Sequence, residues 1–389
     1  MVKFSSVEGA FDQRALTSKE VDLFYFDRDR RTSFPPPASS FIEESTIEDP
    51  YWFFQLKPRY AASSPAYIAV IRDCFVLPSG VVMLADGSLL LESLYPAEPK
   101  DYLAEQKINR NPADAAAMRS IMLGELSPDR AATLTRAVHC REFGESGYFH
   151  WLASVLPRLS LVLHNFRGEL GELLIQNHSD FALDWAHLML PTDASIMHND
   201  GPIFVKELIF PAPAQIGNSH YTRNPWLIEN FRDFIRGRGL LPTKERSKGN
   251  NFIYVSRSDA PVRKLTNEGE LIDRLIGIGF TSYTLTGMSA KEQIGIFSTA
   301  DIVISPHGAG LTNLVFCNQG VQVIELMSVT RSWPGFKVIA RACELNYHSF
   351  ISSQYDTVQS KTAGLGNEDF MVNVKSCTRF IEACLPPGS

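Results

Sequence analysis

The feature that most constrains the fold is an alternation of strand-like and helix-like segments between residues 252 and 345. Short apolar runs (FIYV, DIVIS, VQVIELM) alternate with segments whose apolar residues recur at helical spacing, such as NEGELIDRLIGIGF and SAKEQIGIFSTA. Successive strand-helix units of this kind build a parallel sheet with right-handed crossovers and helices on both faces. The sequence therefore predicts a doubly wound α/β domain in this half.

A less regular alternation of the same kind precedes it, so a chain of 389 residues is expected to hold two α/β domains. The polar, glycine-bearing stretch RGRGLLPTKERSKGNN separates them. We predict an irregular leader or arm over 1–60, a first α/β domain over 61–240 and a second over 241–350. The segment 351–389 is expected to end in a helix that packs back on the first domain.

Composition excludes several classes of protein. Hydrophobic residues make up 44% of the chain and charged residues 21%, as in ordinary globular proteins. The formal net charge of −6 gives no reason to expect a nucleic-acid partner. The six cysteines lack metal-ligand spacing, and the N-terminal residues lack the apolar core of a signal peptide. We therefore expect free thiols, no metal and a cytoplasmic protein.

One turn in the second domain has the composition of an anion site. The strand-like run ending at Ser305-Pro306 is followed by His307, Gly308, Ala309 and Gly310, and then by an apolar segment that predicts a helix. Ligands of open parallel sheets bind at the carboxyl ends of the strands, and glycines there let the backbone approach them closely. A helix start adds unpaired N–H groups. His307 either donates to a phosphate or packs as an ordinary buried histidine.

Cations follow another predicted strand of the same domain. Ser256 and Arg257 come directly after the run FIYV, and Arg263 lies in the loop beyond it. A guanidinium forms paired, charge-assisted hydrogen bonds with phosphate oxygens. Because both strand ends lie at one edge of a parallel sheet, the sequence predicts a diphosphate site there rather than a solvated basic loop.

Other functions compete for these residues. The spacing of Gly308, Gly310 and Asn313 nearly matches a dinucleotide fingerprint, with Glu325 at the ribose position, but that fingerprint belongs to the first unit of its domain. A serine hydrolase would need a G-x-S-x-G elbow after the HGAG turn, and none follows. The D-x-D at residues 27–29 resembles a metal-binding pair but has too short a chain before it. An NAD(P)-dependent oxidoreductase stays open as an alternative.

Together, the ordered segments YVSRSDAPVRKLTNEGEL, SAKEQIGIFSTADIVISPHGAGLTNLVFCNQGVQVIEL and, upstream, YFHWLASVLPRL resemble glycosyltransferase family 61, the capsular-polysaccharide-biosynthesis-like glycosyltransferases. The resemblance implies a GT-B fold, in which two facing Rossmann-like domains with mostly parallel sheets bind acceptor and donor. It also implies an inverting, metal-independent transfer from a nucleotide-sugar, UDP-linked by family, without a cofactor. The upstream segment reads SGYFHWL where bacterial members often have an asparagine before the histidine, so a catalytically degenerate sugar-nucleotide-binding protein is a further alternative.

The resemblance also implies roles for particular residues. The diphosphate would be held by Arg257 and Arg263, with the turn from His307 to Gly310 and Asn313 beside it. Glu325 would face the ribose or brace the loop. Thr286 and Met288 would lie near the base, at another strand end.

An inverting transfer also needs a base for the acceptor hydroxyl. His150 is the first candidate, because its ordinary pKa of about 6.5 suits proton removal near neutrality; Glu142 and Glu145 are alternates. The expected partners are a nucleotide-sugar donor and a saccharide or glycolipid acceptor in surface polysaccharide or lipopolysaccharide assembly. Peripheral association with the inner face of the membrane is a further option, and the sequence does not indicate an oligomeric state.

Overall fold

The computed structural model divides the chain into two compact units, one of residues 1–31 and 62–231, the other of residues 32–61 and 232–389. It describes residues 66–93, 112–214, 224–241, 251–331, 335–363 and 366–385, except 143, 177–178, 193 and 199, and the strand segments 4–5, 21–27, 32–34, 39–42 and 59–61. Residues 28–29 of the D-x-D lie outside the described residues.

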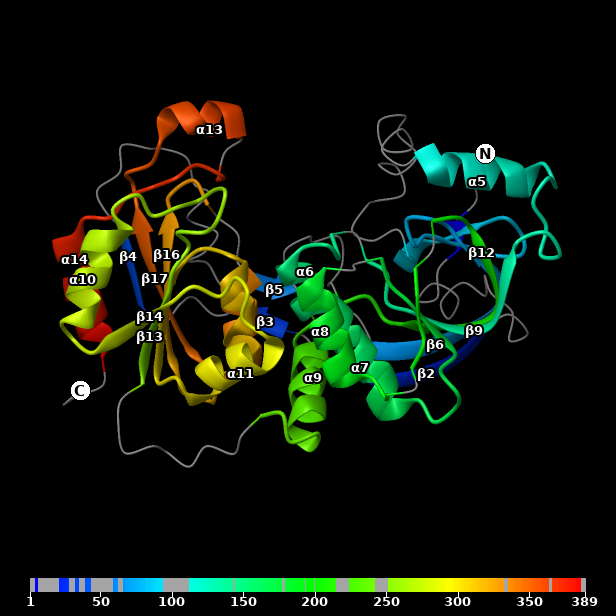
Figure 1. The fold of residues 1–389 in the computed structure, drawn as a ribbon, viewed down its shortest axis with the longest axis horizontal. Coiled ribbons are helices and arrows are strands. Elements are labelled where there is room, and N and C mark those ends of the chain that lie inside the picture. The colour runs from blue at the N-terminus through cyan, green and yellow to red at the C-terminus, as the bar shows by residue number, and fades with distance from the viewer. Residues whose placement is uncertain are drawn as a thin grey trace. The chain divides into compact units, whose positions relative to one another are not determined.

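The first unit is built on a mixed sheet of nine strands in the order β1-β8-β7-β6-β12-β9-β10-β11, with β2 also paired to β6 (Figure 1). β6 runs antiparallel to β2, β7 and β12, whereas β9 to β12 form a parallel set. The strands are β1 Phe4–Ser5, β2 Val21–Asp27, β6 Ala66–Val76, β7 Val82–Met83, β8 Leu89–Leu90, β9 Ala132–His139, β10 Glu172–Leu174, β11 Ile196–Met197 and β12 Ile203–Pro211.

The first unit also contains helices and short helical turns. They are η2 Leu91–Ser93, α5 Pro112–Met122, α6 Tyr148–His150, the π-helical turn Trp151–Val155, α7 Leu156–Asn165, α8 Asp180–Met189 and α9 Pro225–Gly237, whose last residues belong to the second unit. Asn224 caps α9, as the Asn-Pro pair predicts, by accepting from the Trp226 N–H at 3.0 Å. The fully buried Trp151 and Trp185 come from the π-helical turn and from α8.

The second unit is a parallel sheet of six strands in the order β14-β13-β15-β16-β17-β4. Its strands are β13 Phe252–Val255, β14 Phe280–Tyr283, β15 Ile302–Pro306, β16 Gln322–Ser328, β17 Asn346–Ser352 and β4 Ser39–Ile42; β3 Thr32–Phe34 and β5 Arg59–Ala61 form a separate ribbon. Its helices are α10 Glu268–Ile276, α11 Ala290–Thr299, the 3₁₀ segment η4 Ala309–Phe316, α12 Gly335–Ala342, α13 Thr357–Ala363 and α14 Val374–Cys384.

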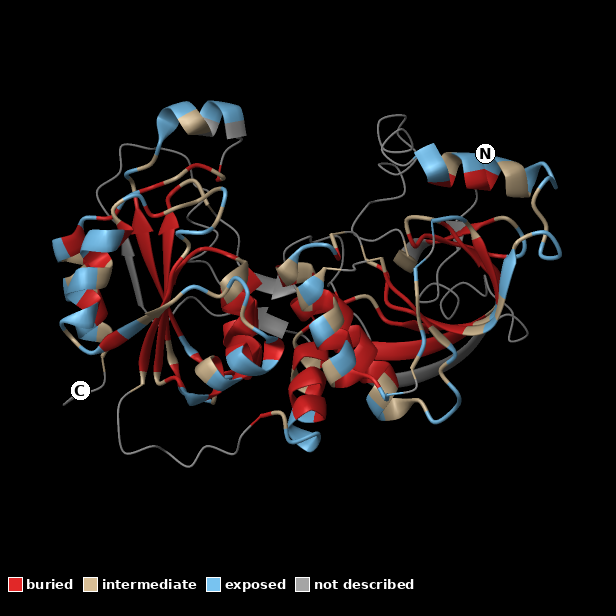
Figure 2. Ribbon diagram, viewed as in Figure 1, coloured by how far each residue is buried: buried red, intermediate tan, exposed pale blue. Residues whose placement is uncertain are grey.

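Helices cover both faces of this sheet, with α10 and α14 on one face and α11 on the other (Figure 1). The strands between them are buried, and the helices expose their outer faces (Figure 2). The five strands β13 to β17 lie in the order 2-1-3-4-5 of their sequence. In such a sheet the order reverses between the first and third strands, here β13 and β15, and ligands bind outside the carboxyl ends at that point.

Three sequence-based expectations need correction. The first 60 residues contribute β1 to β5 rather than an irregular arm, because their strands pair with distant strands that the local sequence does not reveal. The sheet of the first unit is mixed rather than mostly parallel, because β12 joins β6 in antiparallel register. The C-terminal helix α14 packs on α10 and β17 of the second unit, where Cys377 and Ile381 join the core.

The other structural expectations agree with the structure. The Asp86-Gly87 hairpin, the capping box of Ser289 and Glu292, and the strand-helix alternation from β13 to α12 are all present. All six cysteines lie in the described residues and none forms a disulfide. No helix among the described residues is long and apolar enough to cross a membrane.

Candidate functional site

The two predicted halves of the anion site lie next to each other because β13 pairs directly with β15. Tyr254 is opposite Ile304 in the register, so the segments after the two strands begin at the same edge of the sheet. The Ser305 hydroxyl donates to the Val255 carbonyl oxygen at 3.0 Å and ties the two strand ends together. The pairing therefore places Arg257 beside the turn that starts at His307.

Gly308 is required because the Arg257 side chain occupies the space that a Cβ would fill. A Cβ added to Gly308 would lie 1.6 Å from Arg257 Nη1. The φ of Gly308 is 176°, which is extended backbone open to any residue, so the requirement is steric. Arg257 Nη2 donates to the Val262 carbonyl oxygen at 3.0 Å. Gly310 is also crowded, by side chains of Leu285 and Val255 at 3.2 and 3.3 Å from an added Cβ.

Arg263 is held at the same edge by an unusual backbone conformation. Its φ of 58° lies in the left-handed region, and its Nη1 donates to Asn367 Oδ1 at 2.8 Å. Burial, with Arg331 and Arg257 nearby, lowers the pKa of Arg263 to about 10. The Nε atoms of Arg257 and Arg263 are both buried and have no hydrogen-bond partner among the described residues. Two guanidinium groups thus keep unused donors at one strand edge.

Ser256 and Glu268 brace the loop that carries these arginines. Glu268 of α10 is buried and accepts from Tyr254 Oη at 2.9 Å, from Ser256 Oγ at 3.0 Å and from the Arg257 N–H at 3.1 Å. Burial and the Glu268 carboxylate raise the pKa of Tyr254 well above its ordinary value. Ser256, which the sequence placed among the ligand-binding residues, is therefore engaged with Glu268.

His307 is used entirely inside the protein. Its ring is 3% exposed; Nδ1 is hydrogen-bonded to Glu325 Oε1, and Nε2 accepts from Arg331 Nε at 3.0 Å. Burial, followed by the charges of Arg331, Arg263 and Arg257, lowers the pKa of His307 well below its ordinary value. The hydrogen bonds then assign a neutral ring with its proton on Nδ1. Of the two alternatives left open for His307, this arrangement corresponds to the packed, buried histidine.

Glu325 continues the same chain of hydrogen bonds. It is fully buried, and its second oxygen accepts from the Tyr347 hydroxyl. Burial raises the pKa of Glu325 to about 8, against the opposing effects of Tyr347 and Arg331. Of the two roles expected for Glu325, the geometry shows it bracing the turn through His307.

The remaining predicted residues of this site lie at its rim or in its support. Thr286 is exposed and donates to the Asp259 carboxylate, and Met288 is half-buried. The Ala309 carbonyl oxygen accepts from Thr312 at 2.7 Å. Asn313 is fully buried and donates to Gln293 Oε1 at 2.9 Å and to the Gly310 carbonyl oxygen at 3.1 Å. Asn313 therefore supports the turn from inside.

The candidate base lies in the first unit. His150 ends α6, its side chain is 32% exposed, and its Nδ1 lies 3.3 Å from Oε1 of the buried Glu142. Gly144, with a φ of 88°, allows the imidazole to lie against the preceding turn, since an added Cβ would be 2.9 Å from the ring. Glu145 does not share this arrangement: Arg141 Nε donates to it at 2.7 Å, and burial raises its pKa.

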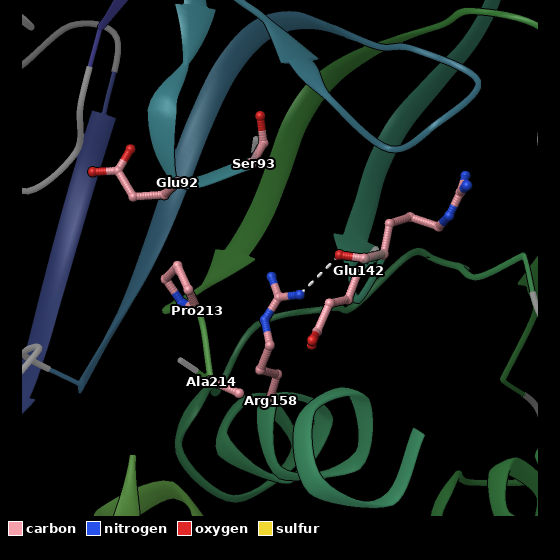
Figure 3. A pocket seen from close by; sticks show the side chains of 7 residues that line it. Glu92, Ser93, Glu142, Arg158, Pro213 and Ala214 are labelled. Atoms are coloured by element: carbon pink, nitrogen blue, oxygen red, sulfur yellow. Dashed lines mark hydrogen bonds between the residues drawn. The ribbon is translucent and has the colours of Figure 1, made fainter. Parts of the chain in front are cut away.

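A polar pocket lies next to Glu142. It is lined by Glu92, Ser93, Arg141, Glu142, Arg158, Pro213 and Ala214 (Figure 3). Arg158 of α7 is 3% exposed and donates to the carbonyl oxygens of Arg141 at 2.9 Å, His139 at 3.3 Å and Pro211 at 3.1 Å. Arg158 thereby ties α7 to the carboxyl ends of β9 and β12, close to the candidate base.

Part of the chain that contains these features matches known proteins. Residues 148–324 match the Glycosyltransferase 61 family model. The resemblance to glycosyltransferase family 61 is therefore confirmed over a range that contains His150, both arginines of the second unit and the HGAG turn.

Individual relatives match over shorter segments. The chain is 32% identical over 121 residues to a beta-1,2-xylosyltransferase of Arabidopsis thaliana, which is 25% of this chain and 23% of that protein. It is 23% identical over 220 residues to the beta-1,2-xylosyltransferase XAX1 of Oryza sativa subsp. japonica, 50% of this chain and 38% of that protein. An EGF domain-specific O-linked N-acetylglucosamine transferase of Bos taurus is 29% identical over 110 residues, which is 27% of this chain and 21% of that protein. The matches thus span well under half of these relatives.

Sequence reasoning missed two residues of the glycosyltransferase 61 region and its surroundings. Arg331 comes just after β16, the strand next to β15, so its place at a carboxyl strand end was the available signal. The second residue is Arg158, which is buried. No local pattern distinguishes such an arginine, because its partners are carbonyl oxygens of distant strands.

Proposed function

We propose that the chain is an enzyme that transfers a sugar from a nucleoside diphosphate sugar to a saccharide acceptor. The observation that carries this proposal is the pair of buried, unpartnered Nε donors of Arg257 and Arg263 at the point where the strand order reverses. Guanidinium groups suit diphosphate oxygens because each supplies several N–H donors in a fixed plane. The family match and the glycosyltransferase relatives support the same reaction class.

We propose the finer features on the same basis. The transfer is inverting, needs no metal ion or other cofactor and uses a UDP-linked donor; the names of the relatives favour xylose or N-acetylglucosamine as the sugar. Arg257 and Arg263 supply positive charge to the departing diphosphate. The two units would serve as the donor and acceptor domains of a GT-B enzyme. Surface polysaccharide or lipopolysaccharide assembly and a cytoplasmic location at the inner membrane face are proposals that rest on the sequence resemblance.

We propose His150 as the base that takes the proton of the acceptor hydroxyl. Glu142 contacts Nδ1, so its carboxylate favours a proton on that nitrogen and orients the ring. The side chain is partly exposed, as a group that reaches a substrate must be.

The test is the thermal stabilisation of the purified chain by UDP, GDP, CMP, NAD and NADP, each with Mg²⁺ and with EDTA. Ligands that bind only the folded state raise the midpoint in proportion to ln(1 + [L]/Kd). A selective shift with one nucleoside diphosphate that EDTA does not change is the expected result, followed by release of UDP from UDP-xylose or UDP-N-acetylglucosamine with a saccharide acceptor. A shift with NAD or NADP alone would support the oxidoreductase instead.

A further inference from the structure

A third arginine converges on the proposed donor site from another strand end. Arg331 follows β16, the neighbour of β15, and its backbone N–H donates to the Ser328 carbonyl oxygen at 2.9 Å. Its Nε donates to His307 Nε2 at 3.0 Å, and its Nη1 lies 3.5 Å from the Gly366 carbonyl oxygen. The imidazole of His307 therefore orients the guanidinium of Arg331 through its Nε.

The imidazole that orients Arg331 is itself held in place by two further side chains. Tyr347 on β17 donates to Glu325 on β16, and the other oxygen of Glu325 accepts from His307 Nδ1–H. Because Nδ1 carries the proton, Nε2 is left as an acceptor, which is the role that Arg331 requires. The side chains of Tyr347, Glu325 and His307 are all almost completely buried. This series of hydrogen bonds ends on the Nε of Arg331.

Three guanidinium charges thus lie near one another. Arg331 contacts His307, and the side chain of Arg257 packs against the adjoining Gly308. Burial, and to a smaller extent the charge of Arg331, lowers the pKa of Arg257 and of Arg263. No carboxylate among the described residues forms an ion pair with Arg257 or Arg263, whose Nε atoms have no partner. The carboxylates nearby are hydrogen-bonded to other groups. Glu268 and Glu368 accept from hydroxyl and backbone donors, Asp259 accepts from Thr286 and Asp369 accepts from the Lys264 N–H. Like charges held together in this way favour binding of a multiply charged anion.

We propose that Arg331 is a third ligand of the donor's diphosphate and that Tyr347, Glu325 and His307 are positioning residues that hold it in place. The inference rests on the proposed function and sharpens it: three guanidinium groups select a donor whose leaving group is a nucleoside diphosphate rather than a monophosphate. Arg331 stabilises the charge that develops on that diphosphate as the sugar leaves.

The test measures binding of UDP, UMP and inorganic pyrophosphate by titration calorimetry. Arg331→Ala is expected to weaken the binding of UDP and of pyrophosphate by roughly 10- to 100-fold, because hydrogen bonds to charged groups are strong. The binding of UMP should weaken by less. Arg331→Lys should recover part of the affinity, since it restores the charge but not the planar donor set. The matched control is Arg274→Ala on the exposed face of α10, which should leave all three affinities unchanged.

The positioning role is tested by a double-mutant cycle. His307→Ala should weaken pyrophosphate binding in the wild-type background and have little further effect in Arg331→Ala, whereas a purely structural role would give additive losses. If wild type binds none of the three probes, the proposed function fails along with this inference. If wild type binds UDP and both Arg331→Ala and Arg331→Lys bind it equally well, only the inference is overturned. Should Arg331→Ala not fold, Arg331→Lys and Arg331→Gln decide the question.

Discussion

At the scale of single residues, the proposed donor site depends on one glycine making room for one arginine. Gly308 has no positive φ, so its role is to leave a space that Arg257 fills. The obstacle that a methyl group would meet is the far end of a flexible side chain rather than backbone. A substitution there should thus move Arg257 without disrupting the sheet.

Gly308→Ala is therefore expected to weaken UDP binding by roughly 10-fold, the size of one lost hydrogen bond to a charged group. The melting temperature should change little, because the sheet and its core are untouched. Calorimetric titration together with thermal unfolding checks both statements. The control is Gly269→Ala in α10, where an added Cβ meets nothing within 4 Å and helix propensity improves. Unchanged UDP affinity in Gly308→Ala would mean that Arg257 does not contact the ligand.

His150 gives the second prediction at this scale. Replacing it with Ala removes the proposed base, so turnover of donor and acceptor should fall by about 10²- to 10⁴-fold while UDP affinity stays the same. Glu142→Gln should cause a smaller loss, because Glu142 only orients the ring. Steady-state kinetics and UDP titration of the two variants separate chemistry from binding. Full turnover in His150→Ala would show that another residue acts as the base.

At the scale of elements, the first unit depends on the attachment of α7 to the strand ends beneath it. Arg158 donates to three carbonyl oxygens at the ends of β9 and β12, and His139 Nε2 is 2.6 Å from the Gly80 carbonyl oxygen. Burial and the charge of Arg158 lower the pKa of His139 to about 3, so this ring stays neutral in the folded protein. One buried arginine thus joins a helix to the sheet near His150.

Arg158→Met should lower the free energy of unfolding by roughly 2 to 4 kcal/mol, because three buried carbonyl oxygens lose their donor. It should also raise the pKa of His139, since a neighbouring positive charge is removed. Denaturant unfolding and an NMR titration of the imidazole measure the two effects. A variant as stable as wild type would show that water replaces the guanidinium at no cost.

At the scale of the whole molecule, the two units are not consecutive pieces of chain. Residues 32–61 belong to the second unit although they lie between two segments of the first in sequence, and β4 pairs in parallel with β17 at the edge of the second sheet. The second unit therefore needs a segment from the opposite end of the chain. An exposed strand edge favours association with other chains.

A fragment of residues 232–389 is expected to aggregate or to melt at a lower temperature than the full chain, because it lacks β4 and exposes the outer edge of β17. Light scattering and thermal unfolding provide the measurement. Adding residues 32–61 through a flexible linker should restore a monomer. A fragment 232–389 that is monomeric and as stable as the full chain would contradict this prediction.

The sequence by itself determined the elements whose signals are local. Helical spacing and caps located α9, α10 and α11, and apolar runs located β13, β15 and β16. Because parallel strands end at a common edge, the sequence also predicted that Arg257 and the HGAG turn would meet. The direct pairing of β13 with β15 confirms this part of the prediction.

Only the tertiary structure decided what depends on distant pairing. It placed β4 beside β17, made the first sheet mixed and packed α14 on the second unit. It also turned His307 inward, toward Glu325 and Arg331, because a buried ring must satisfy both nitrogens with whatever neighbouring strands supply. Local sequence encodes which segments are strands and helices, whereas the partners of a buried polar group are set by strands that lie far apart in the chain.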